Sequence, residues 1–143
     1  MAAERSPQRL ERLLRVRTLQ LGQVQAHEAA AHAKLDSEAQ LRARIVQLAT
    51  NIAPQQDDTG FAASLAAAAY YRDRLHASAQ AAEVRVEAAE EGVERARAAT
   101  REARRDQSAI EKLIARAEAE EAIKTLRAME EAPAFRKKRH APC

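Results

Sequence analysis

Catalysis or metal binding by this chain would depend on its four histidines, one cysteine and 21 acidic residues. His27 and His32 are five positions apart, so on a helix they would not share the face that paired metal ligands need. His76, His140 and the terminal Cys143 each stand apart from residues that would complete a metal site or activate a nucleophile. Three scattered glycines cannot build a phosphate-binding loop. We therefore expect no catalytic residue, no metal site and no cofactor, and we expect that the protein is not an enzyme.

The composition favours long helices over a compact globule. Alanine accounts for 36 of the 143 residues, whereas Val, Ile, Leu, Met, Phe and Tyr together number 29. A globule of this length needs more bulky side chains to offset the entropy of the chain, and a disordered chain lacks such helix propensity. No apolar run of membrane-spanning length and no signal-peptide core occur, so we expect no membrane insertion.

The second half carries a mostly apolar repeat with alternating spacings of three and four residues. Only Arg72, Thr100 and Gln107 interrupt it with polar side chains. A mean spacing of 3.5 residues keeps one face of a helix against a partner helix along its whole length. The repeat comprises Leu65, Ala68, Arg72, Leu75, Ala79, Ala82, Val86, Ala89, Val93, Ala96, Thr100, Ala103, Gln107, Ile110, Ile114 and Ala117.

The first half predicts a helix with a less regular apolar stripe. Ser6 and Pro7 suit the N-cap and the first helical position, and Pro54 disfavours helix in the residue before it. The stripe begins at Leu10 and changes phase after Leu35, which predicts a stammer that locally overwinds a coiled coil. Its members are Leu10, Leu14, Leu21, Val24, Ala31 and Leu35, followed by Leu41, Ile45, Leu48 and Ile52.

The predicted fold is all-α: a long antiparallel two-helix coiled-coil hairpin in which the C-terminal helix overhangs. We expect a single hairpin over residues 1–132, with helix one at 7–53, a turn at 54–60 and helix two at 61–131. Residues 133–143 are expected to form a basic disordered tail.

The turn position predicts which residues face each other. A turn centred near residue 57 gives facing residues whose numbers sum to about 114. Leu21 would then face Val93, Leu35 would face Ala79, Ile45 would face Ala69, and Gly22 would face Gly92. Helix one would end opposite residue 107, leaving about 25 residues of helix two unpaired. This overhang could fray, dimerise or dock on another protein, and it carries Ile110, Leu113, Ile114, Ile123, Leu126 and Met129.

Two arginine clusters are expected to meet at the open end of the hairpin. One comprises Arg5, Arg9, Arg12, Arg15 and Arg17; the other comprises Arg95, Arg97, Arg101, Arg104 and Arg105. Pairing with nearby glutamates explains part of this charge, and an acidic or anionic partner explains the remainder. No aromatic side chain lies among the arginines to stack on bases, so we expect no specific nucleic-acid partner.

Three segments resemble the FliJ family of flagellar type III export stalk proteins. Residues 9–17 (RLERLLRVR) are similar to the opening helix of that family, and Tyr71 followed by Leu75 is similar to its aromatic–leucine pair. Residues 129–132 (MEEA) and 135–139 (FRKKR) resemble its acidic closing box and basic tail. The order of a shorter and a longer helix also matches, so the resemblance covers nearly the whole chain.

The resemblance implies a cytoplasmic stalk and adaptor at the inner membrane. The family's rod resembles the central stalk of rotary ATPases: its terminal end enters the export ATPase ring, and its turn-proximal face meets the membrane-embedded export gate. Members also escort export substrates or chaperones. Tyr70, Tyr71 and Leu75 would contact the gate, although Tyr70 and Tyr71 could instead pack on Ile45 and Leu48. The ring contacts would be Arg5, Arg9, Arg12, Arg15, Ile110, Leu113, Ile114, Ile123 and Leu126.

Two other classes of function remain open from the sequence. One is a self-associating coiled-coil scaffold in which the overhang pairs with a second copy. The other is a phasin-like protein whose helices coat a lipid or polymer surface. The narrow apolar stripe and the small number of large apolar residues argue against the coat.

Overall fold

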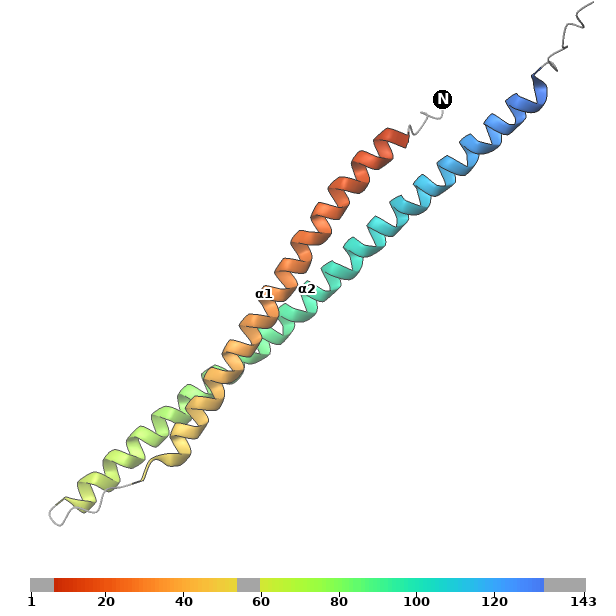
Figure 1. Cartoon of the computed structure of the whole chain (residues 1–143). Helices are drawn as coiled ribbons and strands as arrows, with labels where there is room; N and C mark the ends of the chain where they lie inside the picture. Colours follow the sequence, from red (N-terminus) through yellow and green to blue (C-terminus); the bar gives the residue numbers. More distant parts are fainter. Residues whose placement is uncertain (1–6, 54–59, 133–143) are drawn as a thin grey trace, which may run out of the picture. The chain divides into compact units, whose positions relative to one another are not determined.

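The computed structural model describes residues 7–53 and 60–132, which form two helices (Figure 1). Helix α1 spans Pro7–Asn51 and helix α2 spans Phe61–Glu131. The predicted all-α fold of two long helices is confirmed; α2 occupies the predicted range, whereas α1 ends at Asn51 instead of residue 53. The predictions for Ser6, for residues 54–59 of the turn and for the basic tail lie outside the described residues.

Local sequence explains where the helices begin and why they run so far. Pro7 is the first residue of α1, a position where its missing N–H costs no hydrogen bond. At the start of α2 the Gly60 carbonyl accepts a hydrogen bond from the Ser64 N–H at 2.8 Å. No proline interrupts either helix, so nothing in the backbone forces an earlier end.

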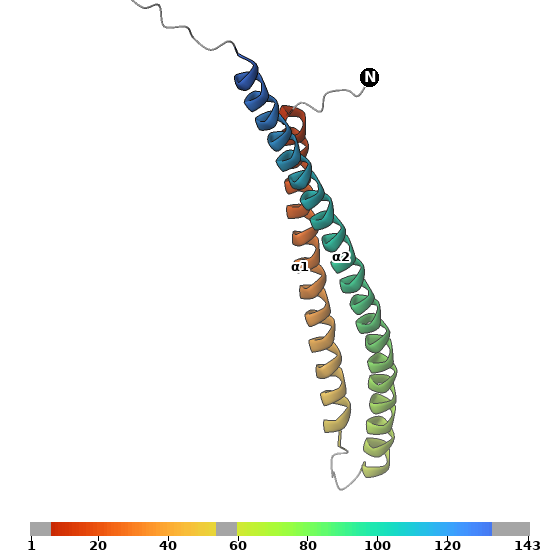
Figure 2. The same cartoon turned by 90° about the vertical axis from the view of Figure 1, so that its right-hand side faces the viewer.

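The chain divides into two compact units, each containing a segment of α1 beside an antiparallel segment of α2 (Figures 1 and 2). We call Leu19–Arg104 the central unit. Met1–Thr18 and Arg105–Cys143 together form the terminal unit. What sequence analysis treated as a single hairpin therefore comprises two units.

The interface that α2 presents to α1 follows the predicted repeat. In the central unit the buried positions are spaced by three and four residues, and in the terminal unit Ile110 is buried while Ile114 and Ala117 are half-buried. The buried Thr100 is tolerated because its hydroxyl donates to the Ala96 carbonyl at 3.1 Å. Leu65 and Arg72 are exposed and do not belong to the interface. The buried residues of this stripe in the central unit are Ala68, Ala82, Val86, Ala89, Val93, Ala96 and Thr100.

The stammer predicted in α1 is wrong. Leu41 and Leu48 are exposed, with Leu48 at 57%, whereas Ala49 is buried. The spacing of three and four continues unbroken because two charged residues occupy interface positions. Glu38 accepts a hydrogen bond from Arg85 Nε at 3.1 Å, and Arg42 forms an ion pair with Glu83 of α2. The α1 interface positions are Leu10, Leu14, Arg17, Leu21, Val24, Glu28, Ala31, Leu35, Glu38, Arg42, Ile45 and Ala49, and the half-buried Ile52 follows just after the helix.

The predicted pairing of the helices is displaced by about ten residues. Glu38–Arg85, Arg42–Glu83 and Arg17–Asp106 are cross-helix pairs whose residue numbers sum to 123 or 125, instead of about 114. Arg72 supports the same pairing by donating from Nη2 to the Ile52 carbonyl at 2.6 Å. The observed pairing places Leu21 opposite Ala103, Leu35 opposite Ala89, and Ile45 opposite Ala79, and Gly22 does not face Gly92.

This pairing shortens the part of α2 that outruns α1 in the terminal unit. Pro7 lies opposite Ala117, so the unpaired helix begins near residue 118 and contains about 14 residues, roughly 21 Å. Every residue from 118 to 131 is exposed. We call this segment the C-terminal extension of α2.

We expect the charge pair between Glu38 and Arg85 to contribute to this alignment of the helices. Glu38→Lys should lower the free energy of unfolding by about 1 kcal/mol, because it places a positive charge beside Arg85. Adding Arg85→Glu should restore most of that loss, as measured by urea unfolding. Asp36→Lys makes the same charge change at an exposed position and serves as control. An equal loss in the single and the double variant would contradict a specific pair.

Candidate partner-binding surfaces

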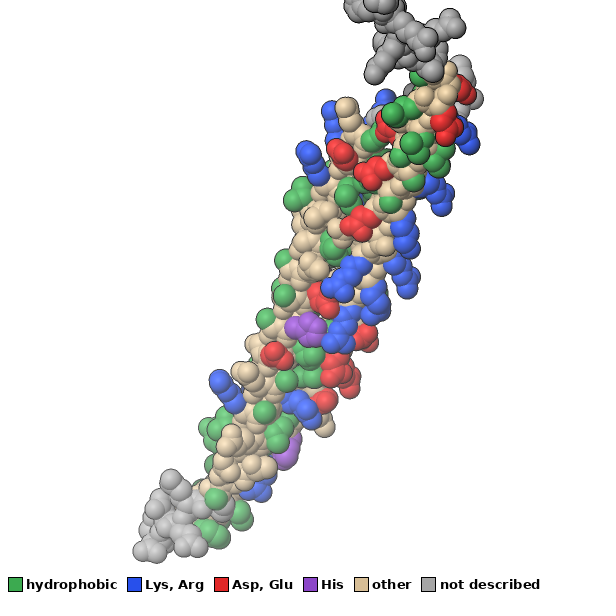
Figure 3. All heavy atoms as spheres, turned by 45° about the vertical axis from the view of Figure 1, so that its right-hand side comes forward, with side chains coloured by type: hydrophobic (Ala, Val, Ile, Leu, Met, Phe, Trp, Pro, Cys, Tyr) green, Lys and Arg blue, Asp and Glu red, His purple; other side chains and the backbone are tan. Residues whose placement is uncertain are grey.

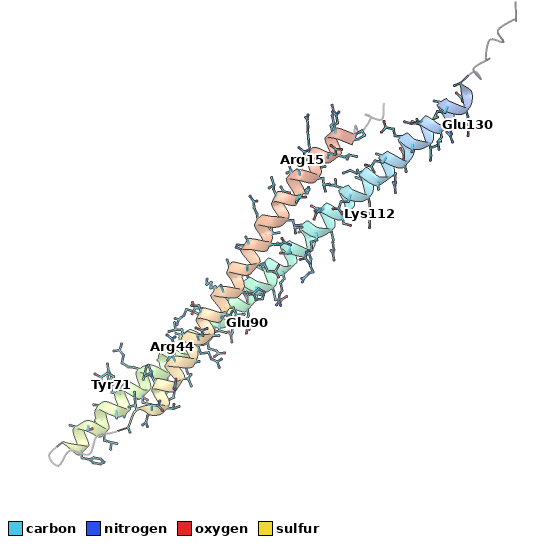
Figure 4. The ribbon with its side chains drawn as sticks, in the orientation of Figure 1. Arg15, Arg44, Tyr71, Glu90, Lys112 and Glu130 are labelled. Atoms are coloured by element: carbon cyan, nitrogen blue, oxygen red, sulfur yellow. The ribbon has the colours of Figure 1, made fainter. Side chains whose placement is uncertain are left out.

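The terminal unit presents exposed arginines and apolar residues on α1. Arg9, Arg12 and Arg15, three of the predicted ATPase contacts, are exposed, and Leu13 and Val16 lie exposed among them. Figure 4 labels Arg15 on α1. Arg9, Leu13 and Val16 follow helical spacing, so they share one face of α1. We call these five residues the α1 terminal surface. The predicted contact Arg5 lies outside the described residues.

The predicted apolar contacts in α2 divide into two groups. Ile110 is buried and Leu113 and Ile114 are half-buried; Ile110 and Ile114 lie opposite Leu14 and Leu10 on the interface with α1. Ile110 and Ile114 therefore do not lie on an unpaired overhang as the sequence analysis expected, and the role of these three residues as ATPase contacts stays a prediction. Ile123 and Leu126 are exposed on the C-terminal extension and remain available to a partner.

Polar contacts join the two helices where the terminal unit begins. Arg17 Nη1 lies 3.0 Å from Asp106 Oδ2, and Gln107 Nε2 donates to Thr18 Oγ1 at 3.3 Å. Thr18 Oγ1 in turn donates to the Leu14 carbonyl at 2.9 Å. Arg17 is therefore used within the molecule, unlike Arg9, Arg12 and Arg15, for which no described residue provides an ion pair.

The α1 arginines belong to the terminal unit, and the α2 arginines of the second cluster, except Arg105, belong to the central unit. The α1 arginines from Arg9 to Arg17 lie opposite α2 residues 107–115, whereas α2 residues 95–104 lie opposite α1 residues 20–29. On α2, Arg95 pairs with Glu91 at 3.6 Å and Arg97 pairs with Glu94 at 2.7 Å. Figure 3 shows basic side chains gathered along one edge of the molecule. The meeting of the two clusters stays a prediction.

The first turns of α2 form an exposed aromatic surface. Tyr70 and Tyr71 are exposed, and their ring centroids lie 5.8 Å apart in an edge-to-face arrangement. Arg74 lies over the Tyr70 ring at 5.8 Å, and its Nη1 donates to the Tyr70 hydroxyl at 3.1 Å. Leu75 is half-buried at an interface position.

The exposure of Tyr70 and Tyr71 bears on the alternative that they pack on α1. The alignment places Ile45 and Leu48 opposite residues near 79 and 76, several positions beyond the tyrosines, so the alternative that Tyr70 and Tyr71 pack on them is not supported. Phe61 and Leu65 are also exposed. In the sequence, the feature that could have drawn attention to Phe61 is that it lies near Tyr70 and Tyr71, the two tyrosines of the chain. Phe61 and Leu65 lie on a different face of α2 from Tyr70, so we call Tyr70 and Tyr71 alone the aromatic surface.

The described residues contain neither a metal-binding cluster nor a bilayer-spanning helix. Residues 7–53 and 60–132 hold no group of three His, Cys, Asp or Glu side chains placed to bind a metal ion. Neither of the described helices combines the length and apolarity needed to cross a bilayer. The candidate functional sites of the described residues are therefore exposed surfaces of the two helices.

Comparisons with protein-family models, with curated proteins and with solved structures found no match for this chain. The resemblance to the FliJ family thus stays a prediction that rests on the segments quoted above. The geometry itself provides three exposed surfaces: the α1 terminal surface, the C-terminal extension of α2 and the aromatic surface.

Proposed function

We propose that this protein is a non-enzymatic adaptor of a type III protein export apparatus, the function implied by the resemblance to the FliJ family. In this proposal the terminal unit binds the export ATPase ring and the aromatic surface binds the membrane-embedded export gate. Export substrates or their chaperones bind the exposed sides of the helices. The protein acts in the cytoplasm, at the inner face of the inner membrane.

The observation that carries this proposal is the pattern of exposure in the terminal unit. Arg9, Arg12 and Arg15 have no ion-pair partner among the described residues, and Leu13 and Val16 expose apolar area beside them. Arginine and exposed apolar side chains are characteristic of protein-binding sites, where a partner carboxylate and an apolar pocket can take them up. Such a surface suits an acidic, partly apolar partner.

The aromatic surface supports a second partner. Tyrosine and phenylalanine give large contact areas with little loss of side-chain entropy, and Tyr71 is 61% exposed. These residues lie in the central unit, whereas the arginines of the α1 terminal surface lie in the terminal unit. Two separate surfaces allow one chain to bind two proteins at the same time, as an adaptor requires.

The distribution of apolar residues also favours an adaptor over a surface coat. The longest apolar stripe of α2 is taken up by its interface with α1. A coat protein needs a continuous apolar face towards lipid or polymer. The remaining exposed apolar residues form short patches that suit individual protein contacts better than a surface.

Stimulation of the cognate export ATPase tests the proposal. The double variant Arg9→Glu and Arg12→Glu should abolish stimulation, because it reverses the charge of the α1 terminal surface. Lys34→Glu with Arg44→Glu makes the same charge change at exposed positions of the central unit and should leave stimulation intact. Stimulation that is unchanged in the Arg9 and Arg12 variant would refute the assignment of this surface to the ATPase.

A further inference from the structure

The apolar residues of the C-terminal extension do not continue the interface with α1. A continuation from Ile114 and Ala117 with the same spacing would reach Glu121, Lys124 and Ala128. Instead a second stripe with spacings of four and three begins before the extension and runs along it. It consists of Ala115, Ala119, Ala122, Leu126 and Met129, all of which are exposed.

This second stripe points away from α1. Ala119 is two positions after the interface residue Ala117, which rotates it by about 200° around the helix axis. Ala115 is one position after Ile114, a rotation of about 100°. The α1 helix of the same molecule therefore cannot cover the stripe, and Met129 remains 70% exposed.

The charges beside the stripe identify a self-complementary edge. One position after each stripe residue lie, in order, Arg116, Glu120, Ile123, Arg127 and Glu130. Read backwards, the edge has glutamate wherever the forward order has arginine, with Ile123 at the centre. In an antiparallel pair of two copies, Arg116 meets Glu130 and Glu120 meets Arg127. None of these four charges forms an ion pair within the described residues.

A parallel pair uses the same charges poorly. In parallel coiled coils, one edge of a helix faces the opposite edge of its partner about five residues away. The opposite edge carries Glu111, Glu118 and Thr125, which would face Arg116, Ile123 and Glu130 respectively. Only the first of these is an opposite-charge pair. The charge pattern thus distinguishes the two orientations.

We propose that a second copy of this chain binds the C-terminal extension in antiparallel orientation, along the stripe from Ala115 to Met129, with Ala122 at the centre of the stripe and Ile123 at the centre of the charged edge. The contact covers only a short helix face, so the pair is weak and reversible. It rests on the proposed function in one respect: Ile123 and Leu126 are also predicted ATPase contacts, so pairing and binding to the ATPase exclude each other. Pairing therefore masks the extension until the ATPase displaces the second copy.

Charge exchange between two variants of the full chain tests the pairing. One variant, Arg116→Glu with Arg127→Glu, has an acidic edge; the other, Glu120→Arg with Glu130→Arg, has a basic edge. Sedimentation equilibrium at high protein concentration should show the wild-type mass rising from 15.8 kDa towards twice that value. Each variant alone should remain monomeric, with pairing weakened by about tenfold or more, and an equimolar mixture should regain the dimer.

A cysteine experiment determines the orientation. In a Cys143→Ser background, Arg116→Cys and Glu130→Cys each provide a single thiol. Mild oxidation of the mixture should form the mixed disulfide, and neither variant alone should form its own. Self-linked dimers of each variant would overturn the antiparallel arrangement, and a wild-type chain that stays monomeric throughout would overturn the pairing.

The two proposals can fail independently. Circular dichroism first establishes that the edge variants are as helical as the wild type, as expected for exposed positions. A wild-type chain that stays monomeric but stimulates the ATPase would refute the second copy and leave the adaptor standing. A wild-type dimer that never affects an export ATPase would refute the adaptor and leave the pairing standing.

Discussion

Replacing Ala89 with Glu is expected to unfold much of the central unit, whereas replacing the adjacent Ala88 with Glu should have little effect. Ala89 is only 6% exposed and lies opposite Leu35 on the interface between the helices. A carboxylate there loses its water without gaining a partner and also forces apart two helices that approach through alanine. We expect a loss of about 3 kcal/mol or more in the free energy of unfolding.

The matched control, Ala88→Glu, separates the effect of burying a carboxylate from the effect of the substitution on helix propensity. Ala88 is exposed on the same turn of α2, so Ala88→Glu makes the same chemical change with its charge in water. Thermal unfolding followed by circular dichroism compares the two variants directly. Equal melting temperatures for both would show that Ala89 does not lie on a packed interface and would contradict the alignment of the two helices.

The α2 stripe was predictable because it repeats over many turns without depending on any single residue. From Leu75 to Ala117 every member of the predicted stripe is buried or half-buried. A regular spacing of 3.5 residues can be recognised even where the residue is alanine. The repeat ends at Ala117, and the bounds of α2 follow instead from the flanking residues Gly60 and Pro133.

The alignment was harder to predict because an alanine-rich interface repeats itself. A displacement of ten residues equals three successive steps of three, four and three, so apolar positions still meet apolar positions after the shift. The discriminating contacts are the charged pairs Glu38–Arg85, Arg42–Glu83 and Arg17–Asp106. The sequence analysis assumed that the last residue of α1 lies level with the first residue of α2. The hydrogen bond from Arg72 to the Ile52 carbonyl shows instead that residue 52 lies opposite a residue well inside α2.

The stammer was wrongly predicted because side-chain size was given more weight than residue spacing. Leu41 and Leu48 attracted the predicted stripe, yet Ala49 and Glu38 occupy the interface. A charged residue can remain at an interface position when its carboxylate reaches an arginine near the edge, as Glu38 does with Arg85. A search of the sequence for apolar spacing alone does not detect such cross-helix charge pairs.

The error in alignment also changed the candidate site. An overhang expected to begin near residue 107 included Ile110 and Ile114, although these two residues lie on the interface with α1. Ile123 and Leu126 remained exposed under either alignment. The resemblance to the FliJ family supplied the tyrosines, and the exposure of Phe61 and Leu65 became visible only in the structure.

Ile110 and Leu126 should therefore respond differently to truncation. Ile110 is only 6% exposed, and Ile110→Ala removes buried apolar contacts, so we expect the terminal unit to lose about 2–4 kcal/mol of stability. Leu126 is exposed, and Leu126→Ala should change stability by less than about 0.5 kcal/mol. Hydrogen exchange of peptides covering residues 7–18 and 105–117 measures the effect, and peptides from residues 82–100 provide an internal reference in the central unit.

The same two variants separate support of the terminal unit from direct contact with a partner. If Ile110 acts by holding α1 and α2 together, Ile110→Ala should reduce ATPase stimulation most under conditions in which the terminal unit is partly open. A lower denaturant concentration in the assay, or a stabilising osmolyte, should then restore the stimulation. Leu126→Ala should reduce stimulation without faster exchange, and the same conditions should not recover it. An Ile110→Ala protein that exchanges as slowly as the wild type but no longer stimulates the ATPase would contradict this supporting role of Ile110.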